Sequence, residues 1–281
     1  MRGKKSKTIR KALRSEFDKF VSSIDDPAVK ERVEKNTIIT GGSIASMLLG
    51  EEVKDYDLYF RDLSTTVAVA EYYVKKFREI DQKSNARVVQ DGSRVSIEVP
   101  SEGVTGDPRL DDVEGEIEHD SDHPDKGLFV PVFLSQNAIT LSDQVQLIIR
   151  FYGEPDEIHK NYDFVHCTNY WTSCDSKLIL HQAALESLLS KELVYQGSLY
   201  PVCSIIRLRK FISRGWVINA GQILKMVLQV SELDLMDLKV LEDQLTGVDS
   251  AYFMQLLEAV KDDDPSKINA SYISEIIDRI F

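Results

Sequence analysis

The feature that most constrains this chain is a glycine pair placed between a β-branched segment and a short apolar helix pattern. Thr37–Thr40 is typical of a strand, and it runs directly into Gly41 and Gly42. Apolar residues then recur at helical spacing up to Gly50, which is typical of a residue that ends a helix. The pattern therefore predicts a strand, a tight turn and a helix in immediate succession.

A turn of this kind favours the binding of phosphate. Backbone N–H groups at the start of a helix have no partner within the helix, and the helix dipole attracts anions there. Gly41 and Gly42 put no side chain in the way of a phosphate, and Ser43 adds a hydroxyl. We therefore expect Gly41, Gly42 and Ser43 to contact the phosphates of a nucleotide.

Two carboxylates follow the helix pattern at a spacing of two residues. Asp55 and Asp57 belong to Asp-Tyr-Asp-Leu-Tyr-Phe, which is typical of a strand, so both carboxylates are expected on one face. Neighbouring carboxylates repel each other unless a cation lies between them, and Mg²⁺ is typically held by one or two carboxylates plus substrate phosphates. Asp55 and Asp57 are therefore predicted to bind Mg²⁺ or Mn²⁺, often with a third carboxylate.

These motifs resemble those of the DNA polymerase beta superfamily of nucleotidyltransferases. More narrowly, the chain resembles the head and neck of bacterial-type tRNA CCA-adding enzymes and poly(A) polymerases. The residues that match the opening motif of that family in order and spacing are Gly41, Gly42, Leu48, Leu49, Gly50, Asp55 and Asp57. The Arg-Asp pair of the family is replaced by Ala45 and Ser46.

Two further segments carry the resemblance through residues 37–216. In the second segment Asp163 and Phe164 match, whereas Asn161 and Tyr162 replace two arginines of the family. The third segment resembles the family's neck helix. Its matching residues are Arg207, Phe211, Arg214 and Gly215, and Lys210 conservatively replaces an arginine.

The resemblance implies roles for several residues. Asp163 would orient or deprotonate the acceptor hydroxyl or help to hold a metal, provided that its strand lies beside Asp55 and Asp57. Glu98 is the rival for this third carboxylate. Arg207, Lys210 and Arg214 are expected to contact the triphosphate or the base.

Composition favours a cytoplasmic protein without disulfides. No apolar run approaches the 18 or so residues needed to span a bilayer, and Cys167, Cys174 and Cys203 lack metal-ligand spacing. The formal net charge of −12 disfavours general binding of nucleic acid, except where basic residues cluster. Two such clusters occur, at residues 2–14 and at residues 207–214. The first is interpreted as a solvated terminus in preference to an RNA-binding arm.

The remaining pattern predicts the organisation of the chain. Residues 9–21 and a segment opened by Pro27 are expected to be helical, and Ser64 is expected to cap a helix ending near Ile80. Residues 86–90 and 94–99 read as a hairpin, and residues 101–126 as a long mobile acidic loop. Further strands are predicted at residues 129–133, 144–151 and 162–167, and helices after Cys174 at residues 185–194, 205–216, 223–230, 233–245, 253–260 and 268–280.

Together these features predict an α+β fold in which a nucleotidyltransferase-type mixed sheet with flanking helices precedes an all-helical neck and body. The predicted divisions are a helical segment at residues 1–35, a head at 36–172 and a neck and body at 173–281. The expected activity is metal-dependent transfer of a nucleoside monophosphate from a nucleoside triphosphate such as ATP to an acceptor hydroxyl, with the RNA 3′ end, as in tRNA, favoured. The alternatives are a protein or small-molecule acceptor, or a non-catalytic binding module.

Overall fold

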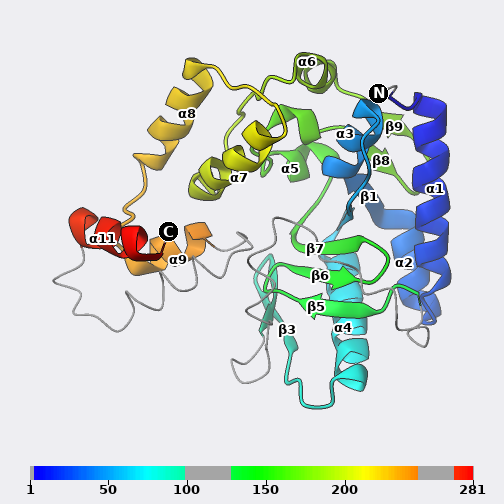
Figure 1. The fold of residues 1–281 in the computed structure, drawn as a ribbon. Helices are drawn as coiled ribbons and strands as arrows, with labels where there is room; N and C mark the ends of the chain where they lie inside the picture. Colours follow the sequence, from blue (N-terminus) through cyan, green and yellow to red (C-terminus); the bar gives the residue numbers. More distant parts are fainter. Residues whose placement is uncertain (1–2, 99–127, 246–268, 281) are drawn as a thin grey trace. The chain divides into compact units, whose positions relative to one another are not determined.

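The computed structural model describes residues 3–98, 128–245 and 269–280 (Figure 1). The described residues fall into two compact units, one that runs to Ser190 and one that begins at Lys191. The predicted acidic loop at residues 101–126 and the predicted helix at residues 253–260 lie outside the described residues.

A mixed sheet forms the centre of the first unit. In the described part of the chain its strands lie in the order β5-β6-β7-β2-β1-β8-β9. Their bounds are β1 Thr37–Thr40, β2 Tyr56–Phe60, β5 Pro131–Leu134, β6 Ala138–Leu141, β7 Val145–Tyr152, β8 Tyr170–Thr172 and β9 Leu178–Ile179. Strands β2 and β7 pair in parallel and the other neighbours pair antiparallel. The predicted mixed sheet is therefore confirmed.

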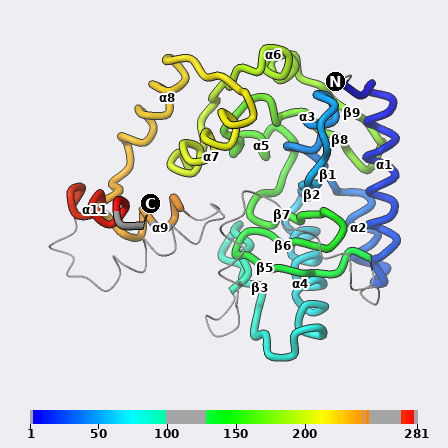
Figure 2. Tube along the Cα trace, in the orientation of Figure 1, coloured from blue at the N-terminus to red at the C-terminus, as the bar shows by residue number. Residues whose placement is uncertain are grey.

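The register of β1 places the glycine turn beside the Asp-x-Asp motif. Thr40, the last residue of β1, is paired with Asp57 of β2. The Cα trace in Figure 2 follows the chain from β1 directly into α3, Gly42–Leu49, as the sequence predicts. Gly50 ends α3 with a left-handed backbone at φ 73°, a conformation that glycine adopts without steric cost.

Helices cover both faces of the sheet. The helices of the first unit are α1 Ser6–Ser22, α2 Pro27–Asn36, α3, α4 Leu63–Ile80, α5 Pro155–His159 and α6 Gln182–Ser190. The main core joins apolar residues of α1 to α4 with Ile39, Leu58 and Leu147 of the sheet. Ile38 and Tyr59 pack with Ile158 of α5 in a separate cluster. Because side chains alternate along a strand, the two clusters lie on opposite faces.

The predicted hairpin is confirmed as a separate two-stranded sheet. Its strands are β3 Arg87–Asp91 and β4 Arg94–Glu98. Val95 and Ile97 of β4 are buried in the main core of the first unit.

The second unit is helical in its described residues. Its helices are α7 Pro201–Ser213, α8 Ala220–Val230, α9 Leu238–Leu245 and α11 Ala270–Ile280. Leu241 and Leu245 of α9 pack with Ile273 and Ile276 of α11 to form its core. The expected helical region after the sheet is thus confirmed, although it begins at α6 and not at Cys174.

The predicted strand at residues 162–167 is wrong. A turn at Lys160 and Asn161 follows α5, Asp163 lies at a bend, and Val165–Cys167 form a 3-10 helix. The physical reason is local: Asp163 Oδ1 accepts the N–H of Phe164 at 3.0 Å, a turn-forming bond that competes with strand pairing. The strand beside β1 is β8, so Asp163 lies on a loop and not on a strand neighbouring Asp57.

Other details also differ from the expected pattern. Asp62, and not Ser64, caps α4, because its carboxylate accepts the N–H of Thr65 at 2.7 Å. Strand β6 and helix α5 were not expected, and β9 lies within a region predicted to be helical. Within the described ranges, none of the helices combines the length and apolar character required to cross a membrane.

Candidate functional site

Gly41 brings the glycine turn into contact with the Asp-x-Asp motif. Its backbone has φ +92°, and a Cβ at this position would lie 2.8 Å from Asp57 Oδ2 and 3.4 Å from the hydroxyl of Tyr162. Its N–H donates to the carbonyl of Cys167 at 3.1 Å. The carboxylate of Asp57 therefore lies against the backbone that leads into α3.

The start of α3 has the features expected of a phosphate site. A Cβ at Gly42 would have no atom within 4 Å, so the space beside this residue is open. Ser43 is 2% exposed, and its buried hydroxyl has no hydrogen-bond partner in the described structure. A buried hydroxyl without a partner costs free energy, and a phosphate oxygen is one group that could accept it.

Tyr162 is a component of this site whose role the sequence did not reveal. Its hydroxyl is buried, although the residue as a whole is half-buried. Burial, together with the proximity of Tyr59 and Asp57, raises the pKa of Tyr162 well above its usual value, so the hydroxyl is neutral. The sequence showed only that Tyr162 replaces an arginine of the family motif. In the structure it provides a neutral hydroxyl near Asp57.

A buried polar network supports the end of β1. The hydroxyl of Thr40 lies 2.9 Å from the carbonyl of Asn169, 3.3 Å from that of Cys167 and 2.8 Å from His159 Nε2. Because carbonyls only accept and a hydroxyl has one proton, Thr40 donates to the carbonyls and His159 Nε2 donates to Thr40. Burial, aided by nearby His181, lowers the pKa of His159 to about 4, so the imidazole is neutral at pH 7. No sequence motif indicated this network.

The three carboxylates named from the sequence lie in different surroundings. Asp55 is exposed just before β2, Asp57 is half-buried within it, and Asp163 is half-buried on the loop next to Tyr162. Within the described ranges, no group of three or more His, Cys, Asp and Glu side chains is arranged to hold a metal ion. Glu98 on β4 accepts two hydrogen bonds from Arg87, at 2.6 and 2.8 Å.

The basic residues named from the sequence belong to the second unit. Arg207 and Lys210 are exposed residues of α7, and Arg214 follows its last turn and is exposed as well.

The donor set of Asp55 and Asp57 fits a hard divalent cation. Both residues offer carboxylate oxygens, and Asp57 Oδ2 lies beside the turn that leads to the proposed phosphate site. Mg²⁺ commonly completes its shell with water and substrate phosphates when the protein supplies only one or two carboxylates. The residues therefore fit Mg²⁺ or Mn²⁺ bound together with a triphosphate.

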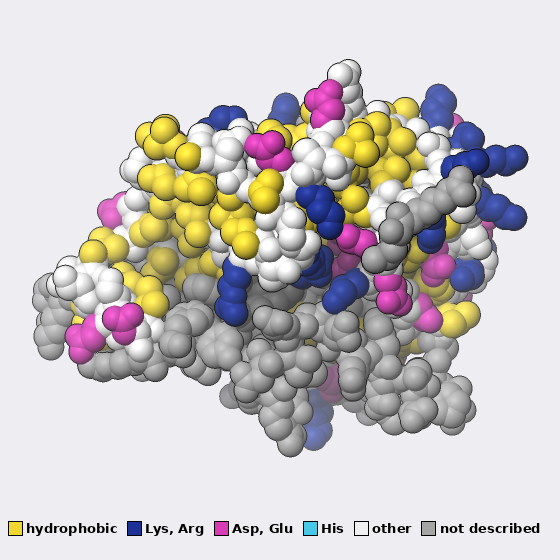
Figure 3. All heavy atoms as spheres, turned by 45° about the horizontal axis from the view of Figure 1, so that its top comes forward, with side chains coloured by type: hydrophobic (Ala, Val, Ile, Leu, Met, Phe, Trp, Pro, Cys, Tyr) yellow, Lys and Arg dark blue, Asp and Glu magenta, His cyan; other side chains and the backbone are white. Residues whose placement is uncertain are grey.

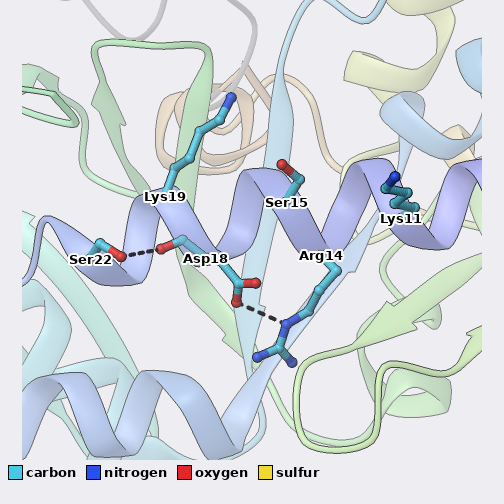
Figure 4. A pocket seen from close by; sticks show the side chains of 6 residues that line it. All are labelled: Lys11, Arg14, Ser15, Asp18, Lys19 and Ser22. Atoms are coloured by element: carbon cyan, nitrogen blue, oxygen red, sulfur yellow. Dashed lines mark hydrogen bonds and ion pairs between the residues drawn. The ribbon is translucent and has the colours of Figure 1, made fainter.

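A hollow on α1 is a surface feature of one helix. It measures about 530 Å³ and is lined by Lys11, Arg14, Ser15, Asp18, Lys19 and Ser22 (Figure 4). Arg14 forms an ion pair with Asp18 at 2.8 Å, and the Ser22 hydroxyl donates to the carbonyl of Asp18. A ligand site normally has concave walls from several elements, so this hollow does not compete with the site at Gly41.

Comparison with solved structures returns tRNA CCA-adding enzymes, the class that the sequence resembles. The Thermotoga maritima CCA-adding enzyme in complex with tRNA is 12% identical, and the match covers 94% of this chain and 55% of the enzyme with a TM-score of 0.42. The Bacillus stearothermophilus CCA-adding enzyme in complex with CTP is 12% identical over 87% of this chain and 52% of the enzyme, also at a TM-score of 0.42. At this sequence identity and TM-score, the substrates of the two enzymes are not assigned to this chain.

Comparison of sequences identifies the family of this chain, which the comparison of structures does not. A curated relative, Gabija anti-defense 2 of Bacillus phage SPbetaL7, is 20% identical over 251 residues, which are 89% of this chain and 51% of the relative. The chain thus spans about half the length of the relative. The profile described as Gabija anti-defense 2 family protein (Gad2) matches residues 11–191, more than half of the 281-residue chain. The chain therefore belongs to the Gabija anti-defense 2 family.

Proposed function

We propose that the first unit transfers a nucleoside monophosphate from a nucleoside triphosphate to an acceptor hydroxyl. The observation that carries this proposal is the close approach of Gly41 to Asp57, which brings the helix start that we propose to bind phosphate beside the carboxylate pair. Either motif alone is common as a turn or a solvated strand edge. Their contact across β1 and β2 supports a shared role.

The proposed reaction is an in-line displacement. The backbone N–H groups at Gly42 and Ser43 bind the β- and γ-phosphates, and Asp55 and Asp57 hold the divalent cation. That cation, when bound, supplies charge neutralisation at the phosphates. The acceptor oxygen attacks the α-phosphorus, a new P–O bond forms, and the bond to the β-phosphate breaks to release pyrophosphate. Catalysis is mainly positioning and electrostatic stabilisation.

Asp163 is proposed to act on the acceptor side. It follows Tyr162 in the chain, and the Tyr162 hydroxyl lies near Asp57. A carboxylate there would orient the acceptor hydroxyl or take its proton as the P–O bond forms. Arg207, Lys210 and Arg214 are proposed to contact the triphosphate or the base, on the strength of the family resemblance alone.

Two separate considerations favour two different acceptors. The motif resemblance favours an RNA 3′ end, such as that of tRNA. The family name favours a component of the Gabija defence system, which would be inactivated by the attached nucleotide. The proposed site is compatible with either acceptor. Its named residues bind the triphosphate, and the acceptor needs only a hydroxyl group that can reach the α-phosphorus.

The test is a transfer assay with each α-labelled nucleoside triphosphate, Mg²⁺ or Mn²⁺, and a mixture of total tRNA and purified Gabija proteins. Label in tRNA supports the RNA acceptor, and label in a Gabija protein supports the second acceptor. Asp55→Asn serves as the inactive control. No label with any nucleotide would mean that the first unit is a binding module and would refute the proposed activity.

A further inference from the structure

Helix α8 presents its aliphatic side chains to solvent. Ile223, Leu224, Val227 and Leu228 are 43%, 57%, 52% and 57% exposed. At a spacing of i, i+1, i+4 and i+5 these four side chains share one face of the helix. A surface helix normally turns such a face towards the core, so this orientation needs an explanation.

The opposite face of α8 is held inward by polar contacts. Gln222 Oε1 accepts the N–H of Tyr195 at 3.0 Å. Gln229 donates to the carbonyl of Ser198 at 2.7 Å, and its Oε1 accepts the N–H of Ser198 at 3.2 Å and the hydroxyl of Tyr195. Met226, on the same side, is 1% exposed. These bonds fix the rotation of the helix, so the outward aliphatic face is built into the fold.

Helix α7 and the residues after it extend this surface. Ile205 and Ile212 of α7 are 42% and 51% exposed, and Val217 is 59% exposed. We call the seven residues the α7–α8 apolar face: Ile205, Ile212, Val217, Ile223, Leu224, Val227 and Leu228. Figure 3 shows hydrophobic side chains gathered over this part of the second unit. Contiguous exposed apolar surface of this kind is typical of protein-binding sites.

The stretch of chain that carries this face is basic, although Glu192 pairs with Val217 and accepts a hydrogen bond from Asn219 at 2.6 Å. Residues 193–231 contain no Asp or Glu but five basic residues, namely Arg207, Arg209, Lys210, Arg214 and Lys225. This stretch therefore differs in sign from the whole chain, which carries a net charge of −12. A partner surface with Asp and Glu would therefore complement it.

We propose that the α7–α8 apolar face docks a protein of the Gabija defence system through an aliphatic stripe bordered by Asp and Glu. An amphipathic helix laid against α8 has this chemistry, with apolar anchors at i, i+3, i+4 and i+7. Aliphatic side chains favour a protein over a nucleic acid, because single-stranded bases bind by stacking on aromatic rings. The inference rests on membership of the family and not on the proposed nucleotide transfer.

The test measures binding of purified Gabija proteins to the full chain by calorimetry. The double variant Leu224→Ser/Leu228→Ser should weaken binding at least tenfold, because interface energy is concentrated in a few central apolar residues. Lys225→Glu should weaken binding several-fold, and this loss should shrink as salt is raised. Leu189→Ser, at an 87% exposed leucine of α6, is the matched control and should bind as wild type.

Three kinds of result would overturn the inference. The first is a binding result: either the wild-type chain does not bind Gabija proteins, or the double variant binds them equally well. The second is a wild-type dimer in sedimentation that the double variant abolishes, because the face would then join two copies of this chain. The third is tRNA binding that the double variant loses. Asp57→Asn should bind normally, which separates this inference from failure of the proposed activity.

Discussion

At the scale of single residues, Gly41 is the position where the fold and the proposed site depend on each other most closely. Alanine at this position would combine an unfavourable φ of +92° with a Cβ 2.8 Å from Asp57 Oδ2. We expect Gly41→Ala to lower the free energy of unfolding by about 1–3 kcal/mol and to displace the Asp57 carboxylate. Urea denaturation measures the first effect and nucleotide transfer the second.

Gly42→Ala is the matched control for stability. Its added methyl group meets no atom within 4 Å, and its backbone is helical. Its free energy of unfolding should stay within about 0.5 kcal/mol of wild type. Equal stability of both alanine variants would contradict the geometry given for Gly41.

Two buried histidines predict acid sensitivity. Burial lowers the pKa of both His159 and His166 from 6.5 to about 4, so the unfolded chain binds more protons than the folded chain between these values. The contribution of the two neutral histidines to the free energy of unfolding is therefore fully present above pH 6.5. It falls by about 1.4 kcal/mol per pH unit per histidine as the pH drops towards 4.

Urea denaturation at pH 7 and pH 5 tests this expectation. His159→Gln keeps a donor for Thr40 and removes one titrating group, so it should show a smaller loss between the two pH values than wild type. An identical pH dependence in wild type and variant would show that His159 does not contribute.

At the scale of elements, α8 offers a test of which face of a helix stabilises the fold. Gln229→Ala removes bonds to Ser198 and Tyr195 and should destabilise the chain by about 1–3 kcal/mol. Leu228→Ala removes an exposed side chain and should change stability by less than about 0.5 kcal/mol. Thermal denaturation compares the two variants. The reverse order would mean that α8 is rotated and that its aliphatic face is buried.

Elements set by local sequence were predictable, and those set by distant pairing were not. Strand β1, helix α3 and the hairpin β3–β4 follow from alternation, glycine positions and helical spacing within short windows. Residues 162–167 read as a strand by composition, but turn bonds at Asp163 and Thr168 decide the form of this segment. The contact of Tyr162 with the Gly41 turn and the hydrogen bond of His159 to Thr40 join residues that are far apart in the sequence. Only the structure reveals them.

At the scale of the whole chain, the N-terminal helix is part of the sheet domain's core. Phe17 of α1 is 2% exposed and lies 5.4 Å from Trp171 of β8, ring centre to ring centre. Phe17→Ala should lower the free energy of unfolding by about 3–5 kcal/mol, measured by urea denaturation. Lys11→Ala, at an exposed residue of the same helix, is the control. A change below about 1 kcal/mol for Phe17→Ala would show that α1 is not integral to the first unit.

Family membership does not by itself reveal which phosphate of a nucleotide is used. The most direct measurement compares nucleoside triphosphate labelled at the α- or the γ-phosphate, in the presence of Mg²⁺ and the acceptor mixture. The α-label should enter a macromolecule and the γ-label should leave as pyrophosphate, and Asp57→Asn should reduce transfer by on the order of a hundredfold or more while remaining folded. Transfer of the γ-label, or full activity of Asp57→Asn, would contradict nucleotidyl transfer at this site.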